Sequence, residues 1–79
     1  MKDAELLNAF YLKCKGHLPH TGKKIKETLA SVAGILIDPH VTSEGFSDQD
    51  VQEIKDNLDD KVKRNQAIIK ALRSVKVSS

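Results

Sequence analysis

The sequence lacks several features on which secreted, membrane-spanning or nucleotide-stacking proteins depend. It has one cysteine, Cys14, among 79 residues, so a disulfide within the chain is excluded and nothing points to an oxidising compartment. It has no tryptophan, one tyrosine and two phenylalanines, so a broad aromatic platform for stacking bases or sugars is missing. Its apolar runs, such as Ile35–Ile37, are far too short to span a membrane.

Length and charge narrow the class of protein further. A chain of 79 residues predicts one domain, 1–79, with a core of marginal size. The first residues carry Asp3 and Glu5 and lack the apolar centre of a signal peptide, which favours a cytoplasmic location. The short length and the general composition suggest a small bacterial or phage protein. A net charge of +2 does not by itself name a nucleic acid as the partner.

The sequence carries no motif of an established enzyme class. A nucleophile elbow, a phosphate-binding loop and a dinucleotide fingerprint are all missing. Asp59 and Asp60 are neighbours on an expected helix and point about 100° apart, so their carboxylates do not form a shared acid–base site. We therefore expect a non-catalytic protein without a cofactor.

Two sets of residues that could ligate a metal do not match the pattern of a known metal site. Cys14, His17 and His20 have a spacing that zinc accepts, but a structural zinc site takes four ligands, and His40 lies beyond a whole expected helix. The loop acids, namely Asp38, Glu44, Asp48 and Asp50, do not follow the alternation of a calcium-binding loop. The sequence predicts no metal site, and the roles of the cysteine and the histidines stay open.

Apolar residues recur at helical spacing in three segments. Over 3–15 the stripe is Leu6, Leu7, Phe10 and Cys14, and over 22–37 it is Ile25, Leu29, Val32 and Leu36. A loop, 38–47, follows, because Asp38 precedes a proline and so disfavours the helical region. Ser47 is then a typical N-cap, flanked by Phe46 and Val51 as a hydrophobic staple. These signals predict an all-α bundle.

The third segment can run from 48 to 76 without glycine or proline. As one helix it would be about 43 Å long, which exceeds its two companions. We therefore predict a three-helix bundle, a helical hairpin plus a long C-terminal helix. A break near Asp60–Gln66 into a fourth helix is the alternative, because apolar residues are sparse there.

Charges divide sharply along this third segment. From 48 to 60 there are six acids and one base, and from 61 to 76 there are six bases and no acid. This pattern complements the helix dipole. It would also set acid against base if two copies lay antiparallel, so we expect any homodimer to be antiparallel.

The apolar residues of the third segment lead to the functional hypothesis. We expect a regulatory or inhibitory adaptor that binds a protein partner through this amphipathic helix. The residues expected to form the protein-binding face are Leu58, Lys61, Val62, Arg64, Asn65, Ile69, Leu72 and Arg73.

Nucleic-acid binding and self-assembly into a structural oligomer are the alternatives. The basic residues that nucleic-acid binding would use are Lys23, Lys24, Lys26, Lys63, Arg64, Lys70 and Arg73. A degenerate helix-turn-helix over 29–45 matches weakly, because its second helix would lack Lys and Arg and would carry Glu44 towards phosphate. A separate basic group lies at one end of the expected hairpin and consists of Lys13, Lys15, Lys23, Lys24 and Lys26 with His17 and His20. Its lysines in the first turn of the second helix oppose the dipole of that helix.

Overall fold

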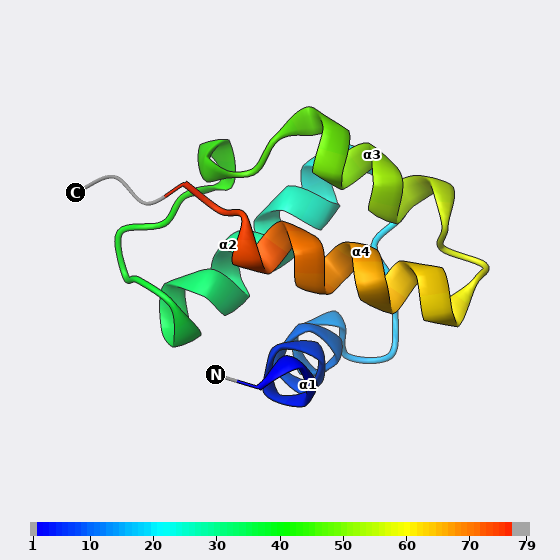
Figure 1. Ribbon diagram of the computed structural model, residues 1–79, viewed down its shortest axis with the longest axis horizontal. Helices are drawn as coiled ribbons and strands as arrows, with labels where there is room; N and C mark the ends of the chain where they lie inside the picture. The colour runs from blue at the N-terminus through cyan, green and yellow to red at the C-terminus, as the bar shows by residue number, and fades with distance from the viewer. Residues whose placement is uncertain (1, 77–79) are drawn as a thin grey trace.

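The structure is a computed structural model that describes residues 2–76, and the regular secondary structure within them is entirely helical. The helices are α1 (Asp3–Cys14), α2 (Gly22–Leu36), a short 3-10 turn η1 (Ser43–Gly45), α3 (Asp48–Asp56) and α4 (Lys61–Arg73) (Figure 1). The all-α prediction is therefore confirmed, and the first two helices end within one residue of the predicted bounds.

The helix starts follow the capping signals of the sequence. The side chain of Thr21 accepts a hydrogen bond from the backbone N–H of Lys24, and Ser47 does the same for Asp50. Each satisfies one of the four N–H groups that a helix start leaves unpaired. The staple residues Phe46 and Val51 are both buried.

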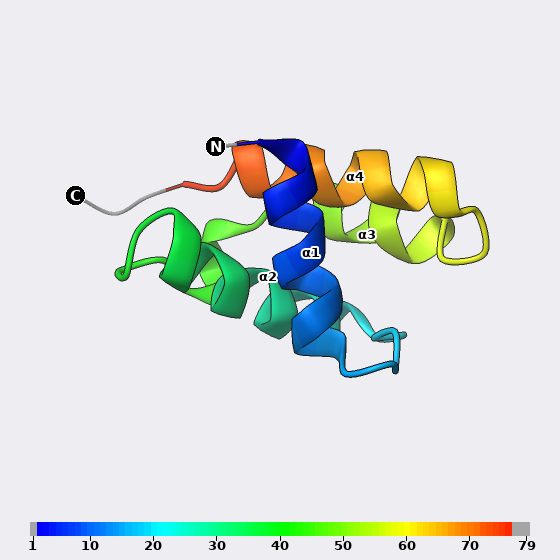
Figure 2. The ribbon, with the colours of Figure 1, turned by 90° about the horizontal axis from the view of Figure 1, so that it is seen from below.

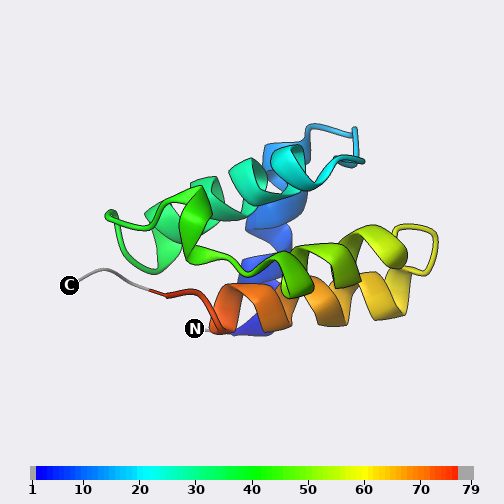
Figure 3. The same ribbon diagram turned by 90° about the horizontal axis from the view of Figure 1, so that it is seen from above.

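The prediction of one continuous helix over 48–76 is wrong, and the alternative, a break into a fourth helix, is confirmed. The chain turns between Asn57 and Asp60, a few residues before the expected weak point, and α4 then runs back beside α3 (Figures 1 and 3). The Asp60 carboxylate caps α4 by accepting from the backbone N–H of Lys63 at 3.1 Å. The Asn57 side chain donates to the carbonyl of Glu53 and so closes the last turn of α3.

Burial explains why the chain turns back. A straight rod would leave the apolar residues of its second half uncovered, whereas the turn places Ile68 and Leu72 in one core with Ile54. All three side chains are almost completely buried. Full burial of a leucine or isoleucine contributes about 1.5 to 3 kcal/mol, which exceeds the cost of ending a helix.

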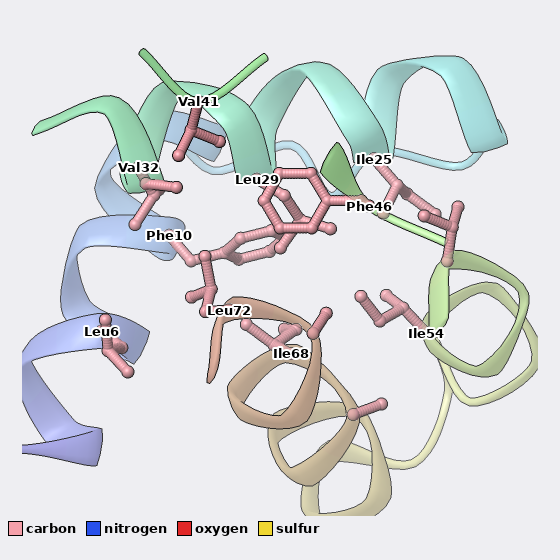
Figure 4. Packing of buried hydrophobic residues seen from close by; sticks show 14 residues of the cluster. Leu6, Phe10, Ile25, Leu29, Val32, Val41, Phe46, Ile54, Ile68 and Leu72 are labelled. Atoms are coloured by element: carbon pink, nitrogen blue, oxygen red, sulfur yellow. The ribbon is translucent and has the colours of Figure 1, made fainter. Parts of the chain in front are cut away.

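The core draws on every helix. Figure 4 shows side chains from α1, α2, α3 and α4 converging on one centre, joined by Val41 and Phe46 from the loop. The buried apolar residues are Leu6, Phe10, Ile25, Leu29, Val32, Ala33, Val41, Phe46, Val51, Ile54, Ala67, Ile68, Ala71 and Leu72. The predicted stripes of the first two helices thus supply five of them, with Leu7, Cys14 and Leu36 half-buried at the margin.

The turn between α3 and α4 also brings the two charged halves together within one chain. The acidic α3 lies against the basic α4, and the ammonium of Lys70 is 3.6 Å from the carboxylate of Glu53. The antiparallel acid–base arrangement that we expected between two copies therefore occurs inside a single subunit. The argument for an antiparallel homodimer required a continuous rod, which is not present, and the oligomeric state itself stays a prediction.

The last described segment returns to the loop. After α4, the backbone N–H of Lys76 donates to the carbonyl of Gly45 at 3.1 Å. A Cβ at Gly45 would lie 2.9 Å from the carbonyl oxygen of Lys76 and 3.2 Å from a methyl of Val75, so the close approach requires glycine. This contact ties the C-terminal end of the bundle to the loop between α2 and α3.

Candidate functional site

The predicted protein-binding face is divided between core and surface. Leu72 is 1% exposed and belongs to the core, while Leu58 and Ile69 are half-buried. Val62, in the first turn of α4, is 66% exposed. The structure therefore uses the second half of the face for folding and leaves only its start open.

Two polar residues of the same face hold α1 against α4. The hydroxyl of Tyr11 donates to the side-chain oxygen of Asn65 and accepts from Nε of Arg64 at 3.0 Å. The guanidinium of Arg64 also donates to the carbonyl of Leu58, and its carbon lies 5.7 Å from the centre of the Tyr11 ring. We call Tyr11, Arg64 and Asn65 the α1–α4 joint.

The joint was missed by sequence reasoning, which noted Tyr11 only as a lone aromatic. Tyr11 lies 53 residues before Arg64, and no local pattern links positions that far apart. The Tyr11 ring also packs edge-on against the ring of Phe10, with centroids 5.6 Å apart. The signal available in the sequence was that Tyr11 directly follows Phe10 of the apolar stripe. A tyrosine hydroxyl beside a buried ring needs a hydrogen-bond partner.

Arg73, the last residue of the predicted face, pairs with the start of the chain. Its Nε and Nη2 lie 2.9 and 2.5 Å from Oδ1 of Asp3. Both side chains are about half-exposed, so the pair contributes little to stability by itself, about 0 to 1 kcal/mol. It does fix the N-terminal turn of α1 over the C-terminal turn of α4, as Figure 2 shows.

The residues of the nucleic-acid alternative do not form one continuous surface of unpaired charge. Lys26 pairs with Asp48 at 2.5 Å, and Lys70 pairs with Glu53. With Arg64 and Arg73 already engaged, the structure leaves Lys23, Lys24 and Lys63 of that set without a side-chain partner among residues 2–76.

The ion pair between Lys26 and Asp48 joins the first turns of α2 and α3. The hydrogen bond and the positive charge of Lys26 lower the pKa of the Asp48 carboxyl. The two side chains line a shallow, open hollow between the helices, together with Gly22, Lys23, Val51 and Gln52. A second open hollow, between α3 and α4, contains the pair formed by Lys70 and Glu53. The first hollow also contains Lys23 and the second contains Lys63, and neither lysine has an ion pair, so each lining has one more base than acid.

The weak helix-turn-helix match has no second helix. After α2 the chain is irregular from 38 to 42 and then forms only the three-residue η1. Asp38 accepts a hydrogen bond from the backbone N–H of His40 at 2.8 Å, which stabilises a turn in place of a helix start. Hydrogen bonding by the Thr42 side chain lowers the pKa of the Glu44 carboxyl, which lies in η1.

The candidate metal ligands are not brought together. Within residues 2–76, no three side chains of His, Cys, Asp or Glu form a group that could hold a metal ion. His17 and His20 are exposed, whereas Cys14 is half-buried at the margin of the core. Burial raises the pKa of the Cys14 thiol, so its reactive thiolate is disfavoured.

No helix in the described part of the chain is long and apolar enough to cross a membrane. Comparison with protein-family models, with curated proteins and with solved structures gave no significant match.

Proposed function

We propose that this protein is a small, non-catalytic module that binds a protein partner and regulates or inhibits it. The observation that carries the proposal is the exposure of Val62. This side chain is 66% exposed in the first turn of α4, whereas Ile68 and Leu72 on the same helix are buried. Because the core covers other apolar side chains of α4, the exposed side chain of Val62 is available as an anchor for a partner.

The surroundings of Val62 indicate what the partner would offer. Lys61 and Lys63 flank it and are exposed. The first turn of α4 contains no acid. The α1–α4 joint holds this end of α4 in place, so the anchor would dock without a large ordering cost. A partner with a small apolar pocket bordered by carboxylates fits this surface best.

A capture experiment with two matched variants tests the proposal. The immobilised protein is exposed to a lysate of its host, the captured protein is identified and purified, and its affinity and stoichiometry are measured by calorimetry. Val62→Asp places an acid near a helix N-terminus, where it favours the helix, so loss of binding would not reflect unfolding. Ile35→Asp is the control, because Ile35 is equally exposed, at 67%, on α2. The new acid opposes the dipole near the C-terminal end of α2, so retained binding in this variant shows that neither a surface acid nor a small loss of stability abolishes binding.

The expected result is one partner bound with defined stoichiometry, lost in Val62→Asp and retained in Ile35→Asp. Equal binding by both variants, or equal loss, would show that the start of α4 is not the contact surface. The salt dependence separates this class from nucleic-acid binding, because apolar docking should change little between about 50 and 200 mM salt.

Self-assembly into a structural oligomer is the remaining alternative. Sedimentation equilibrium of the purified chain would reveal it as a mass above the 8.7 kDa of one chain. Val62→Asp would reduce that mass if copies associate through the start of α4.

A further inference from the structure

Four exposed lysines without an ion pair lie at one end of the bundle. No acid occurs between Glu5 and Glu27, and this stretch contains the end of α1, the connector and the start of α2. Figures 2 and 3 show that the connector forms one corner of the molecule. We call the exposed lysines of this corner the basic end, which consists of Lys13, Lys15, Lys23 and Lys24.

The four lysines of the basic end have no side-chain partner among the described residues. Lys26, Lys70 and Arg73, in contrast, form ion pairs with acids of neighbouring elements. Other lysines without an ion pair, such as Lys2, Lys55, Lys61 and Lys63, have an acid within one to three residues in the sequence. The basic end is therefore the group of unpaired lysines that lies in a stretch without acids.

The backbone makes the basic end unfavourable in two ways, one electrostatic and one conformational. Lys23 and Lys24 lie in the first turn of α2, which has no acid, so they repel the positive end of the helix dipole. Lys15 caps α1 with φ at 51°, in the left-handed region where a side chain is unfavourable. A bound polyanion would offset both the repulsion between the lysines and that with the dipole.

The composition of the corner distinguishes between two kinds of polyanion. Protein interfaces exclude lysine from their centre and need apolar anchors, and Leu12 is the one large apolar side chain exposed beside Lys13. The backbone of a nucleic acid is bound by charge alone, and lysine serves this purpose well. No phenylalanine, tyrosine, tryptophan or arginine lies in the connector, so a large stacking platform and bidentate base contacts are not provided.

From the distribution of unpaired charge, we infer that the basic end binds the phosphate backbone of duplex nucleic acid without sequence preference. This surface is separate from the start of α4, and the inference does not depend on the proposed function. If all four lysines contact phosphate, the logarithm of the affinity should fall with the logarithm of salt concentration with a slope of about −3.6. Binding would then weaken on the order of 100-fold between about 50 and 200 mM salt.

The test uses fluorescence anisotropy with short labelled DNA duplexes of two unrelated sequences. The test variant replaces Lys13, Lys15, Lys23 and Lys24 with glutamine. The control variant replaces four other exposed lysines, Lys2, Lys55, Lys61 and Lys76, with glutamine and so has the same net charge. Circular dichroism confirms that both variants are folded, and polyglutamate and vesicles containing phosphatidylserine serve as alternative polyanions.

The expected result is equal binding of both duplexes, the predicted salt slope, loss in the test variant and retention in the control variant. Equal loss in both variants would mean that net charge alone drives binding and would overturn the inference. It would also be overturned if neither duplex bound at low salt, or if polyglutamate or the vesicles bound more tightly than the duplexes.

Discussion

Replacing Gly45 with alanine should release the contact between the C-terminal segment and the loop. The new Cβ would lie 2.9 Å from the carbonyl oxygen of Lys76, which is backbone and cannot rotate away like the end of a side chain. It would also lie 3.2 Å from a methyl of Val75, which is half-buried against the core. The segment after α4 must therefore move outward.

The cost follows from the contacts that this movement breaks. The hydrogen bond from Lys76 to the carbonyl of Gly45 contributes about 1 kcal/mol. Partial exposure of Val75 costs roughly another 1 kcal/mol, on a scale of about 0.8 kcal/mol for each methylene group. Alanine lowers the conformational entropy of the unfolded chain, which offsets about 0.4 to 1 kcal/mol of this loss. The net free energy of unfolding should fall by about 1 kcal/mol.

Gly34→Ala provides a matched control with the opposite sign. Gly34 lies within α2, and a Cβ there would meet nothing within 4 Å. Alanine is favoured over glycine inside a helix by about 0.5 to 1 kcal/mol, so this variant should be stabilised. The same chemical substitution should therefore lower stability at one position and raise it at the other.

Urea unfolding and thermal unfolding, both followed by circular dichroism, measure the free energy of unfolding and the Tm of both variants. In a domain of this size 1 kcal/mol corresponds to about 4–8 °C in Tm, so the two variants should lie on opposite sides of the parent protein and clearly apart. If Gly45→Ala were as stable as the parent, the close approach of the C-terminal segment to the loop would be wrong. If both variants were stabilised, the glycine contact would have no energetic role.

Four further outcomes follow from single contacts. Asp60→Ala should remove the cap of α4 and cost about 1 kcal/mol, measured by urea unfolding, whereas Asp60→Asn should retain most of it. Tyr11→Phe should leave the polar groups of the joint unpaired and cost about 1 to 3 kcal/mol; no loss of Tm would contradict the joint. Lys15→Gly should raise the free energy of unfolding by about 1 kcal/mol, because glycine adopts a positive φ without strain. Thermal unfolding should accordingly show a higher Tm. The pKa of Asp48 is lowered by Lys26, so the contribution of this pair to stability is present above the ordinary carboxyl pKa and is lost as pH falls through the folded value. Asp48→Asn should accordingly show a smaller loss of stability than the parent protein between about pH 6 and pH 3.

Local features of the fold could be predicted from the sequence because their causes are close in the chain. Thr21 and Ser47 cap helices through N–H groups three residues away, and both caps are present. Helical spacing likewise identified Ile25, Leu29 and Val32 as core residues, and all are buried. The loop after Asp38 also follows from one neighbour, since proline constrains the residue before it.

The functional face was predicted less well, because helical spacing cannot tell whether an apolar stripe is covered by the same chain. Leu72 and Val62 belong to one stripe by spacing, yet one is buried and the other exposed. The difference depends on where α1 crosses α4, which in turn depends on Tyr11 and on the pair between Asp3 and Arg73. Such contacts join residues more than fifty positions apart.

By itself, the sequence determined that the chain is helical, where its first two helices lie, how α3 begins and which of their residues are buried. Those properties depend on hydrogen bonds and periodicities that span a few residues. Only the tertiary structure decided that the chain turns at Asn57–Asp60, because the turn gains its free energy from burying Ile68 and Leu72 against distant helices. The same packing decided which charges are paired and which remain at the basic end, since an ion pair depends on how elements meet in space.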